Sequence, residues 1–491
     1  MVAARQTIAL DGAWAFAGVP ADPRQRTQPQ LAQFSGYTWL PGEVPGTVQA
    51  DLARLGTIPD PFWELNAQDL GWIEQHDWWY RRSFTLPATF TGEQIELECA
   101  GLDTYATIWI NGALVGQHAN QFVPATFAVA AHLRPGENEI VVLLRSTALE
   151  LADKDITRLW RSQSELQAAW ARKCLCSFGW DLAPRIVTFG VWCSIQLVAH
   201  RHATLRDVHV ISTLHGTAHA QIEVHCAVAQ FDAQDLVAEV AIRNPDGALV
   251  GTQRIDLTGQ HATAVHTASF TLTDPALWWP HGMGEQPLYQ CTVRLLAADT
   301  VLDERTVRFG VRSVALQQEP VADGTTFTIV VNDTPIYCKG ANWVPCDALT
   351  LRTTPEHYRA LIELARDAHF TMLRIWGGGI YEDPAFYDVC DELGIMVWQD
   401  FMYACAGYPD FDPGFRAEAE REARIIVQLL RNHPAIVLWC GNNENEWLYL
   451  HQWKPGEQTM TEWLHTLAGW DLFHDILPRV CAELDPTLLA Q

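Results

Sequence analysis

The chain has 491 residues, of which 48% are hydrophobic and 19% are charged, and its formal net charge is -25 at pH 7. This composition is typical of a folded globular protein, and the length indicates two to four domains. The negative charge disfavours phosphate backbones and anionic membrane surfaces, so we expect no nucleic-acid partner and no membrane partner. A neutral small-molecule ligand remains open, and the sequence does not indicate an oligomeric state.

The beginning of the chain predicts no targeting segment. Residues 1–16 alternate apolar with polar positions and contain no continuous apolar region of a signal peptide, and no stretch reaches the length of a membrane-spanning helix. The 12 cysteines contain no CxxC pair, and most lie in apolar segments. Reduced core thiols are therefore expected instead of disulfides or a zinc site. We expect a cytoplasmic protein that uses no metal and no cofactor.

Residues 1–200 contain short alternating segments that predict a β-sandwich. The segments 95–99, 108–110 and 140–144 have the alternation of half-buried strands. Asn111-Gly112 follows the second segment and predicts a tight hairpin turn, because both residues tolerate a positive φ.

Residues 201–310 continue with alternating strands at a spacing that predicts an immunoglobulin-like sandwich. The expected strands cover residues 222–228, 237–242, 268–272, 288–296 and 306–311. No cluster of candidate catalytic residues accompanies these strands, so we interpret the region as a spacer.

Residues 311–491 alternate strands with helices, which predicts a parallel sheet and, from four similar units in a row, a (β/α)8 barrel. The expected strands are 336–343, 371–376, 395–399 and 435–440, and the expected helices are 355–370, 384–393, 413–432 and 463–484. A complete barrel takes about 250 residues, so this region would form only its first half.

The four predicted strand ends carry polar and aromatic residues. These are Asn342 with Trp343, then Trp376, then Asp400, and finally Asn443 with Glu444. Active sites of such barrels lie at the C-terminal ends of the strands. A carboxyl group beside an amide and tryptophans suits glycoside hydrolysis, in which a carboxyl with a raised pKa protonates the leaving oxygen. Glu446 lies two residues further on and is interpreted as structural or solvated.

Several segments resemble the β-mannosidases of glycoside hydrolase family 2. They are "GTIPDPFWELN" at 56–66, "FGVR" at 309–312, "KGANWVPCDA" at 339–348, "LRIWGGGIYE" at 373–382, "VWQDFMYACAGYP" at 397–409 and "WCGNNE" at 439–444. The resemblance implies a jelly-roll sugar-binding-like domain, an immunoglobulin-like sandwich and a catalytic barrel. It also implies a retaining exo-β-mannosidase, which releases terminal β-D-mannose from β-mannosides.

The resemblance assigns roles to individual positions. Glu444 matches the general acid/base, and Asn443 matches the amide that contacts the sugar 2-hydroxyl. Trp376 and Trp453 match aromatic residues of the subsite for the terminal mannose. The segment "FGWDLAP" at 178–184 resembles a loop that reaches over the barrel, in which Trp180 and Asp181 would contact the sugar.

Two departures from the family pattern leave alternatives open. Leu182-Ala183 replaces a Trp-Gly pair, so a family 2 β-glycosidase with another sugar preference is an alternative. The family's nucleophile is a glutamate on the seventh strand, which we expect beyond the end of this chain. A non-catalytic fragment or carbohydrate-binding remnant is therefore the second alternative.

Overall fold

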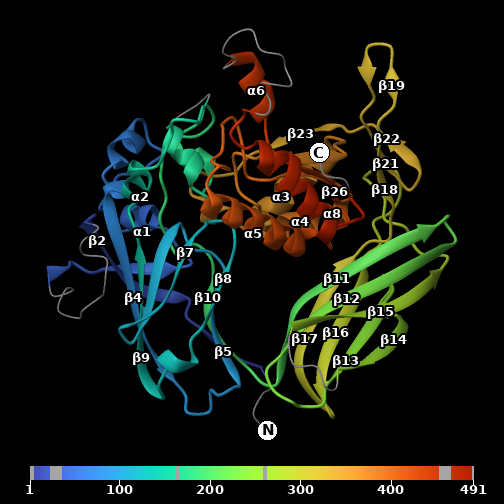
Figure 1. The fold of residues 1–491 in the computed structure, drawn as a ribbon, viewed down its shortest axis with the longest axis horizontal. Coiled ribbons are helices and arrows are strands. Elements are labelled where there is room, and N and C mark those ends of the chain that lie inside the picture. Colours follow the sequence, from blue (N-terminus) through green and yellow to red (C-terminus); the bar gives the residue numbers. More distant parts are fainter. Residues whose placement is uncertain (1–4, 23–35, 162–164, 258–262, 453–465, 489–491) are drawn as a thin grey trace.

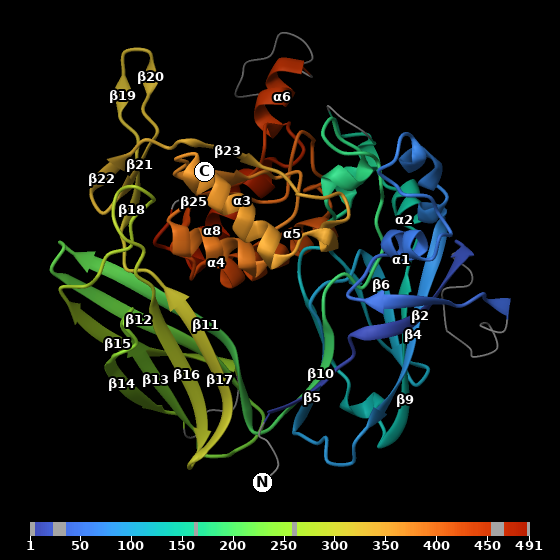
Figure 2. The same cartoon turned by 180° about the vertical axis from the view of Figure 1, so that it is seen from behind.

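The computed structural model describes residues 5–22, 36–161, 165–257, 263–452 and 466–488. Their elements form three groups, two made of antiparallel sheets and a third that combines a parallel sheet with helices (Figure 1). The third group lies above and between the other two in Figure 1, and Figure 2 shows the same arrangement from behind.

The first group is a pair of antiparallel sheets with a shared hydrophobic core. The six-stranded sheet contains, in spatial order, β3 (Leu40–Val44), β2 (Gly12–Pro20), β4 (His76–Leu86), β9 (Gly136–Leu144), β6 (Tyr105–Ile110) and β7 (Ala113–Ala119). The four-stranded sheet contains β1 (Arg5–Ala9), β10 (Ile195–His200), β5 (Gln94–Cys99) and β8 (Ala125–Ala128). Two short helices, α1 (Val48–Arg54) and α2 (Thr147–Ala152), accompany them. Phe16 and Leu97, from opposite sheets, belong to one buried cluster.

The predicted hairpin turn between β6 and β7 is confirmed. Asn111 and Gly112 have φ values of 52° and 80°, and Ile110 pairs with Ala113 across the turn. Two consecutive positive φ values match the right-handed twist of the paired strands.

The second group has a three-stranded and a four-stranded antiparallel sheet around its own core. The sheets contain β11 (Ala203–His215), β12 (His219–Gln230) and β15 (Thr263–Thr273), and β14 (Leu249–Asp256), β13 (Val237–Arg243), β16 (Tyr289–Ala297) and β17 (Thr300–Phe309). The sequence did not predict β11 or β14. A bulge between Leu205 and Asp207 interrupts the alternation of β11, and β14 is an edge strand without a buried residue.

Short strands connect this group to the parallel sheet. They are β18 (Val314–Gln317), β19 (Pro320–Val321), β20 (Gly324–Thr325), β21 (Thr328–Val331) and β22 (Thr334–Ile336). The prediction of a single strand over 336–343 is wrong. Ile336 ends β22, which pairs with β21, whereas β23 (Gly340–Trp343) begins the parallel sheet. Tyr337, 84% exposed, lies where the chain passes from one sheet to the other.

The third group contains a parallel sheet whose strands follow the chain order. The strands are β23, β24 (Met372–Ile375), β25 (Met396–Asp400) and β26 (Ile436–Cys440). The helices between and after them are α3 (Pro355–Asp367), α4 (Pro384–Leu393), α5 (Pro413–Leu430), α6 (Asn445–Gln452) and a final segment formed by η9 (Leu472–Ile476) and α8 (Leu477–Leu484). Of the helix predicted over 463–484, residues 463–465 lie outside the described residues, and 466–469 form turns instead of helix. The four parallel strands and the helices α3, α4 and α5 alternate as predicted, whereas α6 after β26 was not predicted.

The helices α3, α4 and α5 begin as expected because each start has the same local signal. Thr354, Asp383 and Asp412 accept a backbone N–H with their side chains, and a proline follows each of them. Such a capping residue satisfies a free donor, and proline is pre-organised for the first helical position. Residue Gly394 ends α4 with a φ of 73°, whereas α3 and α5 end two or three residues earlier than predicted.

A buried ion pair joins the first group to the third. Arg172 donates to both carboxylate oxygens of Glu422 on α5, at 2.6 and 2.7 Å, and both side chains are at most 3% exposed. Asn120 Nδ2 donates to Glu422 Oε2 at 2.9 Å, and the Phe122 ring meets the Tyr381 ring edge-on. These contacts hold the loops of the first group against the parallel sheet, next to the strand ends.

Candidate active site

Residues at or after the C-terminal ends of the four parallel strands line one cavity of about 480 Å³. The described residues that line it are Trp180, Asp181, Leu182, Asn342, Val344, Trp376, Cys405, Asn443, Glu444, Trp447 and Leu448. All the sequence-predicted site residues are among these except Trp453, which lies outside the described residues. The parallel register brings the ends of β23, β24 and β26 to the same edge, so residues far apart in sequence meet there.

The loop from the first group reaches this cavity as a tight turn. Trp180 and Ala183 exchange two backbone hydrogen bonds, of 3.1 and 3.3 Å, so Asp181 and Leu182 form the tip of the turn. Leu182 is 48% exposed. The Trp180 ring meets Trp376 at a centroid distance of 5.2 Å and an interplanar angle of 62°. The first and third groups thus contribute one tryptophan each to the wall of the cavity.

The position of Trp376 depends on a glycine. A Cβ atom on Gly378 would lie 2.0 Å from the Trp376 indole, so only glycine lets the ring fold over this backbone. The carbonyl of Gly378 accepts the backbone N–H of Cys176 at 3.1 Å, which ties the loop after β24 to the first group. The neighbouring glycines are packed as closely, since a Cβ atom would lie 2.6 Å from the Tyr403 carbonyl at Gly377 and 2.9 Å from the Pro345 ring at Gly379.

Glu444 lies between β26 and α6 in an uncommon backbone conformation. Its φ is 61°, in the left-handed region that costs a non-glycine residue roughly 1–3 kcal/mol. Cys405, from the loop after β25, has a φ of 49° and lies 3.6 Å, Sγ to Oε2, from the Glu444 carboxylate. Backbone strain of this kind concentrates at functional sites. Glu446 instead pairs with His474 at 2.7 Å, in agreement with its structural interpretation.

A chain of hydrogen bonds links the strand ends behind the cavity. Arg374 on β24 donates to both oxygens of Asp400, at 3.1 and 2.8 Å, and to Asn443 Oδ1 at 3.0 Å. Asn443 Nδ2 then approaches Cys405 Sγ at 3.4 Å. The sequence placed Asp400 at the end of the third parallel strand, beside the other candidate site residues. Since Asp400 is 0% exposed and paired with Arg374, its role is to hold the Arg374 side chain in place. Burial raises its pKa to about 6 against the lowering effect of Arg374.

Glu382 is a second buried carboxyl near the sheet edge. It accepts hydrogen bonds from the Tyr358 hydroxyl at 2.6 Å and from Trp343 Nε1 at 3.1 Å. Burial raises its pKa to about 7, although both hydrogen bonds lower it. Trp343 thereby anchors the end of β23, and Tyr358 anchors α3, to the loop that precedes α4.

The sequence did not assign Cys405 or Trp447 to the site. Cys405 follows the end of the third parallel strand by five residues, so its loop position was the available signal. Trp447 lies three residues after Glu444, in the first turn of α6, and it is 54% exposed at the cavity.

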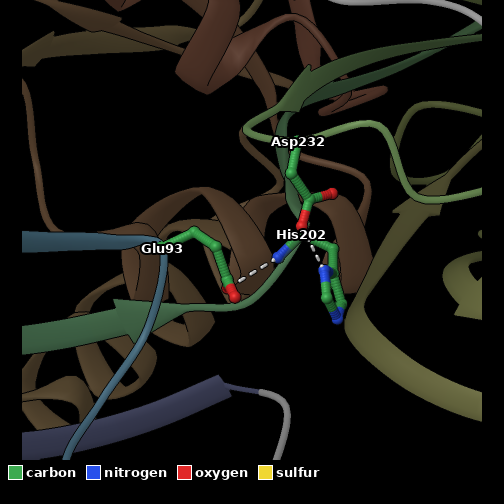
Figure 3. A group of neighbouring side chains, drawn as sticks. All are labelled: Glu93, His202 and Asp232. Atoms are coloured by element: carbon green, nitrogen blue, oxygen red, sulfur yellow. Dashed lines mark hydrogen bonds and ion pairs between the residues drawn. The ribbon is translucent and has the colours of Figure 1, made fainter.

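Groups of side chains that could hold a metal ion lie elsewhere among the described residues. One is Glu93, His202 and Asp232, at the junction of the two antiparallel groups (Figure 3). Glu93 accepts the backbone N–H of His202 at 3.1 Å, and Asp232 binds the His202 ring at 2.6 Å. Protein donors already occupy these carboxylates, so we assign no metal to them.

The other two groups with metal-ligand spacing also have protein partners. They are Glu96, Glu98 and His200, and Asp388, Asp391 and His433. Arg206 holds Glu96 with two hydrogen bonds, and His433 pairs with Asp391. Both sets are explained as ion pairs that join elements of the fold.

All 12 cysteines are thiols. Most are buried, as expected. The prediction of a core position is wrong for Cys338, beside the passage between β22 and β23, and for Cys346, because both are exposed. No helix within the described ranges is long and apolar enough to cross a membrane.

Comparison with known families identifies the class of two parts of the chain. The model "Glycosyl hydrolase 2 galactose-binding domain-like" matches residues 24–193, and "Glycosyl hydrolases family 2" matches residues 203–312. The chain belongs to glycoside hydrolase family 2.

Similar proteins carry a narrower name. Beta-mannosidase B of Thermothelomyces thermophilus is 34% identical over 99% of this chain and 56% of the relative, and that of Emericella nidulans is 32% identical over 90% and 53%. The crystal structure of beta-D-mannosidase from Dictyoglomus thermophilum matches with a TM-score of 0.90 and 37% identity, over 99% of this chain and 57% of that one. The chain thus spans about half the length of the curated relatives it matches. A Bacteroides uniformis beta-glucuronidase, at 19% identity and a TM-score of 0.72, shares the fold.

Proposed function

We propose that the protein is a retaining exo-β-mannosidase that hydrolyses terminal β-D-mannose from β-mannosides. The observation that carries this proposal is the cavity that Glu444 and Asn443 share with Trp376 and the Trp180-Asp181 turn. Aromatic rings can pack against the C–H faces of a sugar, while a few polar groups bind its hydroxyls. The names of the similar proteins support mannose as the sugar.

Glu444 is proposed as the general acid/base. As an acid it protonates the leaving glycosidic oxygen, and as a carboxylate it then activates the water that hydrolyses a glycosyl-enzyme. Asn443 is proposed to bind the sugar 2-hydroxyl, where hydrogen bonds strengthen in the transition state. Trp376, Trp180 and Asp181 are proposed contacts of the terminal mannose.

The retaining reaction needs a second carboxyl about 5–5.5 Å from the first. Asp400 is unsuited to this role because it is fully buried and paired with Arg374. We assign the nucleophile to a later strand, in the part of the family's length that this chain does not span. The parallel sheet is accordingly proposed as the first half of a (β/α)8 barrel at 311–491. It would follow a jelly-roll domain at 1–200 and an immunoglobulin-like domain at 201–310.

Replacing Glu444 with Gln in the full-length protein tests the assignment. Loss of the acid should lower turnover of a phenyl β-mannoside by about 10²–10⁴-fold, the usual contribution of general acid–base catalysis. A dinitrophenyl β-mannoside, whose leaving group needs no proton, should lose much less in the first step. Glu446→Gln is the matched control, since Glu446 lies two residues away and pairs with His474. Wild-type turnover of the phenyl substrate by Glu444→Gln would disprove the role.

The chain's coverage of only about half of each relative favours a second candidate, a carbohydrate-binding fragment without hydrolytic activity. Calorimetric titration of this chain with mannose and methyl β-mannoside, followed by assays of the same preparation, separates binding from catalysis.

A family 2 β-glycosidase with another sugar preference is the remaining alternative. A panel of aryl β-mannoside, β-glucosaminide and β-galactoside decides it, because the highest kcat/KM identifies the preferred sugar.

A further inference from the structure

Cys405 occupies the space between the two polar residues at the end of β26. Its Sγ lies 3.6 Å from Glu444 Oε2 and 3.4 Å from Asn443 Nδ2. An amide nitrogen is a donor, so the sulfur accepts from Asn443 and its S–H is left to donate to the carboxylate. Cys405 is 4% exposed and lines the same cavity as Glu444.

The backbone holds this thiol in a defined place. The Cys405 N–H donates to the Asn443 carbonyl at 2.9 Å, and the preceding residue, Ala404, forms a parallel bridge with Asn443. The buried Tyr408 hydroxyl accepts the Ala404 N–H at 2.9 Å. A φ of 49° at Cys405 persists because these bonds fix the segment on both sides. The sulfur is therefore pre-organised and does not depend on a flexible loop.

The charged and titratable groups around this contact come from several elements. Arg374 approaches from β24 and Asp181 from the turn over the cavity. Arg161 approaches from the first group, and its backbone forms a bridge with Ala406 of the third group. It is 5% exposed, and its Nε and Nη2 have no hydrogen-bond partner among the residues that the structure describes. Tyr408 completes the set. The neighbourhood of the contact therefore contains two cations, Arg374 and Arg161, and the carboxylates of Glu444, Asp181 and the paired Asp400.

We propose that Cys405 is a positioning residue for Glu444, whose S–H···O hydrogen bond holds one carboxylate oxygen so that the other exchanges the proton with the substrate. This inference rests on the proposed role of Glu444. Because Oε2 receives the thiol hydrogen, Oε1 is the oxygen that gives a proton to the leaving group and takes one from water. The bond persists through both steps, so no heavy atom of the acid/base needs to move between them.

The substitution Cys405→Ala removes the donor, and Cys405→Ser retains one. For a phenyl β-mannoside we expect kcat/KM to fall about five- to tenfold in Cys405→Ala, the effect of one modest hydrogen bond, with recovery in Cys405→Ser. For a dinitrophenyl β-mannoside, which needs no acid, we expect a change below about twofold. The basic limb of the pH profile should shift upward in Cys405→Ala, because the carboxylate loses a stabilising donor, and return toward the wild-type position in Cys405→Ser.

The ratio of the two kcat/KM values is the decisive quantity, because it does not depend on how much of a variant is folded. Cys390→Ala is the matched control, since Cys390 is fully buried on α4. An equal loss on both substrates with an unmoved pH limb, or no difference between the Ala and Ser variants, overturns the positioning role. If Glu444→Gln keeps full turnover of the phenyl substrate, the proposed function itself fails. If Glu444→Gln loses turnover but the Cys405 variants keep the wild-type ratio, only the role of Cys405 fails.

Discussion

Arg374 and Asp400 form a bidentate ion pair at the ends of β24 and β25, with nitrogen–oxygen distances of 3.1 and 2.8 Å. The same guanidinium reaches Asn443 on the next strand end at 3.0 Å. The buried Asp400 carboxylate therefore holds the Arg374 guanidinium in place, and the guanidinium in turn holds the Asn443 amide beside Glu444. The candidate site therefore includes Arg374 and Asp400, which lie behind the residues that line the cavity.

The first prediction follows from the unequal exposure of this pair. Arg374→Met leaves the fully buried Asp400 without its cation, so we expect the free energy of unfolding to fall by about 3–5 kcal/mol at pH 7.5. Asp400→Asn should cost less, because the side chain of Arg374 is 24% exposed and can be hydrated. Urea denaturation of both variants measures the difference. The penalty of Arg374→Met should shrink at low pH as Asp400 is protonated; an Asp400→Asn variant less stable than Arg374→Met at pH 7.5 contradicts this account.

The second prediction concerns the pH dependence of stability through Glu382. The pKa of this carboxyl is raised from 4.5 to about 7 by burial, so between these pH values the folded state binds more protons than the unfolded state. Its contribution to stability is present below pH 4.5 and is lost as the pH rises through about 7. Glu382→Gln resembles the protonated form and should be more stable than the wild type at pH 8, by up to about 3 kcal/mol.

Urea denaturation at pH 4, 6 and 8 checks this dependence on Glu382. The advantage of Glu382→Gln should disappear at pH 4, where the wild-type carboxyl is already protonated. Glu363→Gln on α3 serves as the control, since its side chain is 42% exposed. A stability difference that stays constant from pH 4 to pH 8 would show that the buried charge is not its cause.

The third prediction concerns the contact that holds the first group on the parallel sheet. Glu422→Gln leaves Arg172 buried without a counter-charge, and we expect a loss of about 3–5 kcal/mol. Glu420→Gln, two residues earlier on the same helix, removes a surface pair with Arg424 and Arg479 and should cost at most about 1 kcal/mol. Thermal unfolding of both variants in parallel measures the contrast. Equal melting temperatures would exclude an energetic role for the Arg172–Glu422 pair.

Local signals explain why much of the third group could be predicted. The starts of α3, α4 and α5 are encoded by a capping residue followed by proline, and the strand ends follow from short apolar segments. The failures also have local causes. The bulge in β11 breaks its alternation, and the exposed Tyr337 lies between two strands that were predicted as one.

The sequence by itself determined which residues stand at the strand ends, because helix starts and strand periods depend on neighbours within a few positions. The hydrogen-bonded set of Arg374, Asn443 and Cys405 was decided only by the tertiary structure. Arg374 and Asn443 are 69 positions apart, and Cys405 and Glu444 are 39 apart. No local pattern encodes such contacts. They arise because parallel pairing brings the strand ends to one edge of the sheet, and because the bidentate pair with the buried Asp400 holds the Arg374 guanidinium next to Asn443.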